Sequence, residues 1–344
     1  MNTAKIMGAL VLSAGLLAAG LASAEDFYRG KKISIVSSSA PGGGYDQYAR
    51  LLSRHIGKHI PGEPTIIVQN MPGAEGIKAA NFIYNLAAQD GTFIGALPRT
   101  LSLSKLYAHH EHMLQFDPFG FQWLGSLKRD TGVLIVNTKS GMARPEDLKT
   151  RDVTLSSQAL NSPNSMYARM LNALYGAQLK PVEGYEGSTA GMLAVERFEV
   201  DGHVTGGTTA PIKNKIQSWM KAGQGRVVLQ FGMHQDMDYP DAPLVMDLVT
   251  DPQAREIFEL AFTEQEIGAP YVMGPKVPTE RVQVLEKAFI ETARDPDFLA
   301  DAAHENAPIY LLDAPAIQAL LKRAYATPPE SIQKLRDLAG VKKD

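Results

Sequence analysis

The sequence predicts an α/β protein with two mostly parallel β-sheets covered by helices. Short runs rich in β-branched residues alternate with amphipathic segments along the whole chain, and the connections between them are short. Such alternation is typical of βαβ units. The chain has 344 residues, of which 44% are apolar and 21% charged, so it is long enough for one large or two medium domains.

The expected strands and helices follow from hydrophobic periodicity. A strand at 33–37 leads into a glycine-rich turn and then into a helix at 45–56, where apolar residues recur every three or four positions. Residues 255–344 are predicted to be mainly helical. The remaining expected strands are 65–69, 92–97, 132–137, 153–157 and 226–231, and the remaining expected helices are 76–88 and 163–174.

Composition excludes several classes of function. The formal net charge is −3, which gives no basic face for nucleic acid. No cysteine is present, so disulfides, thiolate metal sites and a cysteine nucleophile are excluded. The histidine run 109–112 has no distant partner cluster, and neither G-x-G-x-x-G nor G-K-[ST] occurs. We therefore expect no cofactor and no metal, and no set of residues indicates an enzyme.

The N-terminus indicates export. Lys5 is followed by the apolar run 6–21 and by the small residues Ala22-Ser23-Ala24, as in a secretory signal peptide. A membrane anchor is the alternative, but the run is broken by glycines and is short for a bilayer span of about 20 residues. We expect cleavage after Ala24, a periplasmic protein, and no membrane insertion after cleavage.

Two loops are candidate ligand sites, each between a strand and the start of a helix. The first comprises Pro41, Gly42, Gly43, Gly44, Tyr45 and Asp46. Its glycines allow the backbone to approach an anion closely, and the helix start adds partial positive charge. We expect Asp46 to hold the loop and not to act as a base. Either loop alone is also explained as a plain turn or helix cap.

The second loop is rich in neutral hydrogen-bond donors. Ser162 is expected as a helix N-cap with Pro163 at the first helical position. Arg99 follows the strand 92–97 and provides a fixed cation, either for a ligand carboxylate or for a surface salt bridge. The two loops together favour a carboxylate clamp across a cleft. The expected ligand-binding residues of the second loop are Ser157, Gln158, Ser162, Asn164 and Ser165.

With these motifs in hand, the chain resembles the Bug-type periplasmic receptors of tripartite tricarboxylate transporters. The stretch 33–52, ISIVSSSAPGGGYDQYARLL, matches the family's strand–PGG-x-x-D-x-x-A-R–helix signature, and 68–76, VQNMPGAEG, matches its E-N-x-P-G-A-G-G segment. The turn 90–92, the stretch 184–187 and Val200-Asp201-Gly202 match further family positions. The likeness extends over essentially the whole chain after the signal peptide.

The resemblance implies a type II periplasmic binding protein, with two Rossmann-like domains around a ligand cleft that closes on its solute. The first domain would comprise 25–126 plus 231–344, and the second 127–230. The implied ligand is a small organic acid, the implied partner a membrane permease, and the receptor itself a monomer. Tyr185 and Thr208 complete the implied ligand-binding residues.

Departures from the family pattern concern the ligand. Ser38 and Ser39 replace the usual Pro-Phe, Glu75 and Ile77 replace Gly and Asn, and Glu186 replaces the common Lys. These changes make the expected site more polar and remove a cation. Two alternative functions remain: a periplasmic sensor for a two-component system, and an exported α/β hydrolase.

Overall fold

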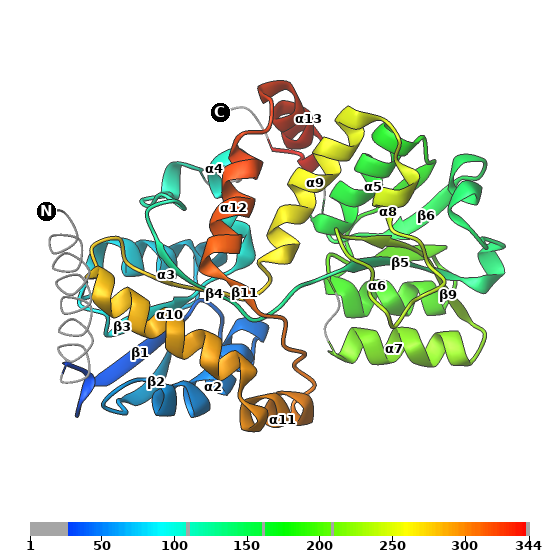
Figure 1. The fold of residues 1–344 in the computed structure, drawn as a ribbon. Helices are drawn as coiled ribbons and strands as arrows, with labels where there is room; N and C mark the ends of the chain where they lie inside the picture. Colours follow the sequence, from blue (N-terminus) through cyan, green and yellow to red (C-terminus); the bar gives the residue numbers. More distant parts are fainter. Residues whose placement is uncertain (1–26, 108–110, 160–161, 208–209, 342–344) are drawn as a thin grey trace, which may run out of the picture. The chain divides into compact units, whose positions relative to one another are not determined.

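The computed structural model describes residues 27–107, 111–159, 162–207 and 210–341, and within them the chain forms two compact α/β units (Figure 1). Unit 1 contains the chain up to Leu101 with His112–Lys128 and Ile267–Ala319, and unit 2 contains Ser102–Glu111, Arg129–Glu266 and Leu320–Asp344. None of the helices in the described ranges has the length and apolar character that a bilayer span needs. The predicted α/β class with two sheets is confirmed.

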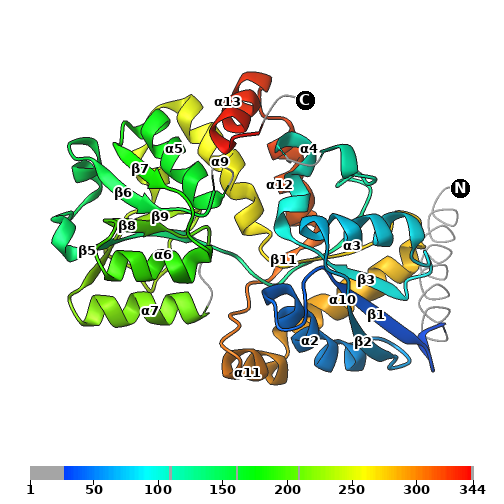
Figure 2. The same ribbon diagram turned by 180° about the vertical axis from the view of Figure 1, so that it is seen from behind.

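The sheet of unit 1 has six strands in the order β11-β4-β10-β3-β1-β2 (Figure 2). β1 is parallel to both of its neighbours, whereas β10 is antiparallel to both of its neighbours. The carboxyl ends of β1, β2 and β3 therefore meet at one edge. The strands are β1 (Lys32–Ser37), β2 (Thr65–Asn70), β3 (Phe93–Ala96), β4 (Gln122–Ser126), β10 (Pro270–Met273) and β11 (Leu312–Asp313).

Three of the helices of unit 1 pack on its sheet through a shared buried apolar core. Leu51 of α2, Phe289 of α10 and Phe298 of α11 share this core with Ile33 and Ile35 of β1. Since β1 alternates its side chains, Ile33 and Ile35 lie on the same face of the sheet. The helices are α2 (Gly44–His55), α3 (Ile77–Asn81), which continues into a π-helical turn at Phe82–Leu86, α10 (Thr279–Arg294) and α11 (Pro296–His304).

The sheet of unit 2 has five strands in the order β7-β6-β8-β5-β9. β6 is parallel to β7 and β8, whereas β5 is antiparallel to β8 and β9. Val133 and Ile135 of β5 share a core with Val195, Ile216 and Trp219 from two helices. The strands are β5 (Gly132–Asn137), β6 (Val153–Ser156), β7 (Leu179–Val182), β8 (Gly202–Val204) and β9 (Gly225–Phe231).

Helices make up much of the rest of unit 2 and the end of the chain. The division between the units falls inside α12 (Ala314–Tyr325). The others are α4 (Ser104–Tyr107), α5 (Pro163–Tyr175), α6 (Gly187–Glu196), α7 (Ala210–Lys221), α8 (Val245–Leu248), α9 (Pro252–Glu266) and α13 (Pro329–Ala339).

The prediction of mostly parallel sheets is wrong, because both sheets are mixed. The chain crosses from one unit to the other just before each of these strands. It enters unit 2 at Arg129, before β5, and returns to unit 1 at Ile267, before β10. β5 and β10 each start beside the carboxyl ends of the parallel strands. Gly132, the first residue of β5, pairs with Phe231 at the end of β9. Pro270, the first residue of β10, accepts a hydrogen bond from the Leu97 amide just after β3. A strand that starts at that edge runs antiparallel to its neighbours.

The observed division of the chain differs from the expected one at 102–111, 231–266 and 320–344, which belong to unit 2, and at 127–128, which belong to unit 1. Aromatic packing explains the position of 231–266. The Tyr167 ring of α5 stacks on Phe231 with ring centroids 5.2 Å apart, and it meets Phe262 of α9 edge-on at 5.7 Å. All three side chains are fully buried. Periodicity in the sequence identified the helix without indicating which core its aromatic face joins.

Replacing Phe262 tests this packing. Phe262→Ala is expected to lower the free energy of unfolding of unit 2 by about 3–5 kcal/mol, since a large buried side chain is removed. Tryptophan fluorescence can report on each unit separately, because the chain has two tryptophans, Trp123 in unit 1 and Trp219 in unit 2. In a Trp123→Phe background, Phe262→Ala should move the midpoint of urea unfolding, followed by Trp219 fluorescence, to a lower urea concentration. The packing would be contradicted if Phe262→Ala left the Trp219 midpoint unchanged and lowered only the Trp123 midpoint, measured in a Trp219→Phe background. Phe298→Ala, in the core of unit 1, is the matched control.

Candidate functional site

In unit 1 the glycine loop joins β1 to α2. Gly42 has a φ of +80°, a conformation that favours glycine, and Gly43 is the extended N-cap of α2. A Cβ at Gly43 would lie 3.0 Å from the Ser39 side chain, whereas a Cβ at Gly44 would meet nothing within 4 Å. The loop therefore leaves open space beside Gly44, in the first turn of α2.

Asp46 ties this loop together from the first turn of α2. Its carboxylate accepts hydrogen bonds from the Gly42 amide at 2.8 Å, Asn70 Nδ2 at 2.7 Å and Arg50 Nε at 2.9 Å. The side chain is 2% exposed. Burial by itself raises the pKa of Asp46, but the bonds from Arg50, Gly42 and Asn70 outweigh it and lower the pKa. Asp46 is thus an ionised anchor whose acceptor positions are taken by the protein.

Serines form the base of the glycine loop. Ser39 Oγ accepts from the Asp46 amide at 3.0 Å and lies 3.2 Å from Ser37 Oγ. Ser38, by contrast, is 7% exposed and its hydroxyl has no hydrogen-bond partner. A buried hydroxyl without a partner is costly unless something else satisfies it, so Ser38 identifies a place where a ligand or water would be stabilised.

Loops after β2 and β3 meet the glycine loop at the same edge of the sheet. The run Gly73–Gly76 has four consecutive positive φ angles, including 46° at Ala74 and 52° at Glu75. A Cβ on Gly76 would lie 2.3 Å from Pro98 Cγ and 3.3 Å from Ser38 Cβ, so this strained turn packs directly against both neighbouring loops. The Arg99 amide donates to the Tyr45 hydroxyl at 3.1 Å. Arg99 and Tyr45, both expected in the site, are therefore adjacent.

In unit 2 the serine loop follows β6 and leads into α5. Ser162 is at the N-cap position as predicted, but its hydroxyl does not cap the helix. It donates to the Ala159 carbonyl at 2.6 Å and lies 3.0 Å from Ser157 Oγ. The Ser165 side chain is fully buried and its hydroxyl has no partner. Unit 2 thus repeats the pattern of unit 1, with a helix start and an unpartnered buried hydroxyl.

The remaining expected residues of unit 2 differ in exposure. Gln158 is exposed, whereas Tyr185 is half-buried and its amide donates to the Ser157 carbonyl at 3.1 Å. Asn164 is buried and lies 3.4 Å from His203 Nε2. Thr208 lies outside the described residues. Sequence analysis missed His203, because a single histidine in a short strand carries no motif.

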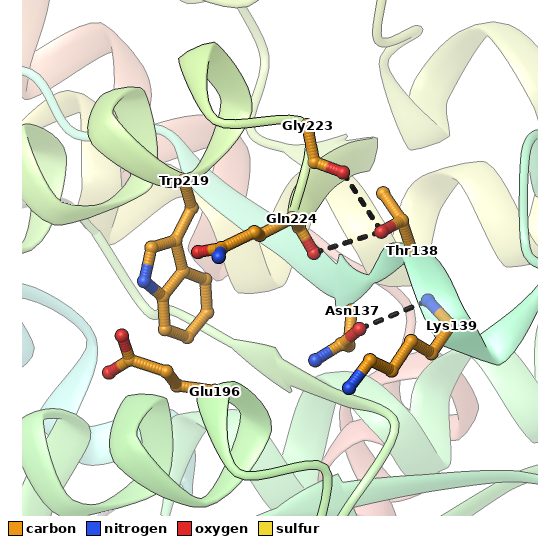
Figure 3. Close-up of a pocket in the computed structure, with 7 residues that line it drawn as sticks. All are labelled: Asn137, Thr138, Lys139, Glu196, Trp219, Gly223 and Gln224. Atoms are coloured by element: carbon orange, nitrogen blue, oxygen red, sulfur yellow. Dashed lines mark hydrogen bonds between the residues drawn. The ribbon is translucent and has the colours of Figure 1, made fainter.

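A separate hollow of about 160 Å³ lies at the other end of the sheet of unit 2 (Figure 3). It borders the end of β5 and the start of β9, where Asn137 pairs with Gly225, whereas the serine loop follows the end of β6. The hollow is therefore not part of the candidate site. Its lining residues are Asn137, Thr138, Lys139, Glu196, Trp219, Gly223 and Gln224.

In the described ranges no group of three or more His, Asp or Glu side chains could hold a metal ion. His109 and His110, considered above as part of a histidine run, lie outside those ranges. His112 is described and exposed.

Solved structures show which fold this is. A TctC solute-binding protein from Polaromonas matches with a TM-score of 0.69 and 14% identity, over 91% of this chain and 99% of that one. The periplasmic binding protein BugD matches with a TM-score of 0.61 and 18% identity, over 92% and 100%. An R. palustris protein solved with adipate matches with a TM-score of 0.59 and 15% identity, over 90% and 98%. No protein-family model and no curated protein sequence matches this chain.

These likenesses show the fold. The chain has the two-unit α/β fold of TctC and Bug-type periplasmic binding proteins, and the expected resemblance is confirmed at that level. The Polaromonas protein and BugD are described as binding proteins, and two other proteins with this fold were solved with the carboxylates adipate and malate.

Proposed function

We propose that the protein is an exported solute receptor that binds a small organic acid and delivers it to a membrane permease of the tripartite tricarboxylate type. One observation carries the proposal. Each loop has a buried hydroxyl without a partner: that of Ser38, between β1 and α2 in unit 1, and that of Ser165, in the first turn of α5 in unit 2. Helix starts and hydroxyls are suitable donors for a carboxylate.

In this proposal the two loops bind the same ligand molecule. Residues 41–45 in unit 1 and the loop 157–165 in unit 2 supply the donors, while Asp46 keeps the first loop in shape. Binding would favour the closed form by the difference in its affinity for the closed and open forms. Export rests on residues 1–24, which lie outside the described ranges, and the permease and the monomeric state rest on resemblance alone.

An enzyme is a weaker candidate. Ser156 Oγ lies 2.8 Å from His203 Nδ1, which is the spacing of a serine nucleophile and its base. However, both side chains are at most 1% exposed, and the other imidazole nitrogen faces the Asn164 amide and not a carboxylate. A nucleophile must reach its substrate, so this pair fits a structural role better.

A thermal-shift screen tests the proposed function. Residues 25–344 would be unfolded, dialysed and refolded to remove bound ligand, then heated with mono-, di- and tricarboxylates, aromatic acids and amino acids. A ligand at 100 times its Kd stabilises the protein by about 2.7 kcal/mol, which raises the unfolding midpoint of a chain of this size by about 4 °C. We expect shifts with carboxylates, confirmed by calorimetry. No shift with any acid would contradict the proposal.

Arg99 tests the number of carboxylates that the ligand carries. If its guanidinium pairs with a second carboxylate, Arg99→Ala should weaken a dicarboxylate by about tenfold and a monocarboxylate much less, since one charge-assisted bond is lost. The control is Arg226→Ala, which removes the same charge from an exposed position in β9. Calorimetric titrations compare the affinities. Equal losses for both ligands would remove Arg99 from the site.

A further inference from the structure

A buried polar cluster underlies the serine loop of unit 2. Ser156 ends β6, His203 lies beside it in β8, and Asn164 is in the first turn of α5. These three side chains are 0%, 1% and 6% exposed. They come from three different elements, so the cluster is formed only when unit 2 is folded.

Gly191 makes room for this cluster. A Cβ at Gly191 would lie 2.8 Å from both His203 Nδ1 and Ser156 Oγ, closer than real Cβ contacts. Gly191 is inside α6 and has no positive φ, so backbone conformation does not require glycine there. A glycine inside a helix costs about 1 kcal/mol relative to alanine. Glycine at this position therefore weakens α6 but leaves room for the imidazole.

The imidazole touches a hydrogen-bonding group at each nitrogen. Nδ1 lies 2.8 Å from Ser156 Oγ and 3.2 Å from the Ser156 carbonyl oxygen, and Nε2 lies 3.4 Å from Asn164 Nδ2. Burial lowers the pKa of His203 to about 4, against a smaller opposing effect of the Ser156 carbonyl. The ring is therefore neutral at pH 7 and carries a single N–H, at either Nδ1 or Nε2.

The position of that proton decides which end of the Asn164 amide remains for a ligand. With the proton on Nε2, the ring donates to Asn164 Oδ1, Ser156 Oγ–H donates to Nδ1 across the shorter contact, and the Asn164 NH₂ group is left as a donor. With the proton on Nδ1, the ring accepts from Asn164 Nδ2, and a carbonyl oxygen is left. In the structure Asn164 Nδ2 faces Nε2, which is the second arrangement; the first requires the amide to be flipped, which exchanges its oxygen and nitrogen without moving the rest of the side chain.

We propose that His203 is a positioning residue of the ligand site: protonated at Nε2, it holds the Asn164 amide with its NH₂ group free to donate to the ligand carboxylate. The inference rests on the proposed function, because a carboxylate requires a donor at this position. His203 itself does not touch the ligand. Ser156 Oγ donates a hydrogen bond to Nδ1 and so completes the series of hydrogen bonds from Ser156 through His203 to Asn164.

Two conservative variants of His203 distinguish the roles of its two ring nitrogens. The amide of His203→Gln can take the place of Nε2 and reach Asn164, whereas the amide of His203→Asn can take the place of Nδ1 and reach only Ser156. Against a carboxylate that binds the unmutated protein, we expect His203→Gln to keep its affinity within about threefold and His203→Asn to lose about tenfold or more, the change for one hydrogen bond. Thermal midpoints of the two variants should be similar.

Equal affinities in the two variants would overturn the role of His203 and leave the proposed function intact. No carboxylate binding by the unmutated protein would overturn both. A second measurement does not depend on the variants folding: ¹⁵N NMR of the histidine-labelled protein, with His203 assigned from its backbone, reports which nitrogen carries the proton. We expect a neutral ring protonated at Nε2 in the carboxylate complex. A proton on Nδ1 in that complex, or a charged ring at pH 7, would overturn the inference.

Discussion

Gly44→Val is expected to raise the Kd for the carboxylate ligand by at least about 100-fold while leaving the fold intact. A Cβ at Gly44 meets nothing within 4 Å, and its φ is not positive, so the folded protein accommodates the side chain. The added branches would fill the open space beside the first turn of α2 and keep a carboxylate from the backbone N–H groups there. Gly43 is less suitable, since its Cβ would displace Ser39.

The matched control for Gly44→Val is Ser53→Val, which puts the same β-branched residue into α2 two turns further on. Both variants should unfold within about 1 kcal/mol of the unmutated protein, because the helix propensities of glycine, serine and valine differ by less than that. Calorimetry gives the affinities and urea denaturation gives the stabilities. If Gly44→Val bound the ligand normally, the glycine loop would be only a turn.

Asp46→Ala is expected to lower the free energy of unfolding by about 1–2 kcal/mol and to abolish ligand binding. Removing the carboxylate takes an acceptor from the exposed Gly42 amide and from the half-buried Asn70 side chain, whose Nδ2 keeps its bond to the Ser39 carbonyl at 3.0 Å. The Arg50 side chain is 47% exposed and is rehydrated, so its lost ion pair contributes little. Without Asp46 the loop also loses the bond that fixes Gly42 in its left-handed conformation.

The pH dependence of stability gives an independent test of Asp46. Its pKa in the folded protein is lower than the unfolded value of about 3.9, so it contributes stability above that value and loses this contribution as the pH falls through the folded pKa. The stability difference between the unmutated protein and Asp46→Asn should be constant from pH 7 to 5 and shrink below pH 4. A difference that stayed constant down to pH 3 would show that folding does not lower the pKa of Asp46.

Strands with strong local patterns could be predicted from the sequence. The runs 33–37, 65–69 and 132–137 are rich in β-branched residues and correspond to β1, β2 and β5 within one residue. Five other strands, β4, β7, β8, β10 and β11, were not predicted. Of these, β7, β8 and β10 are three or four residues long and contain Pro181, Gly202 or Pro270, so neither periodicity nor propensity identifies them. Pairing with longer neighbours stabilises them.

The candidate site was predictable where it consists of backbone, and not where it consists of side-chain contacts. Glycines before a helix indicate a loop that can approach an anion, and Asp46 in the first turn indicated an anchor. Nothing local indicated that Asn70, from the next strand, would be its second partner, or that Ser162 would bond to Ala159 and leave the helix uncapped.

The sequence by itself determined the α/β class, the two loops at helix starts and the resemblance to periplasmic receptors, because each depends on neighbouring residues in the chain. The tertiary structure alone decided that the sheets are mixed, that 231–266 belong to unit 2, and that His203 lies between Ser156 and Asn164. These facts depend on which distant segments share a core. The contacts of Tyr167 with Phe231 and Phe262, and the space that Gly191 leaves for an imidazole, arise only when those segments meet.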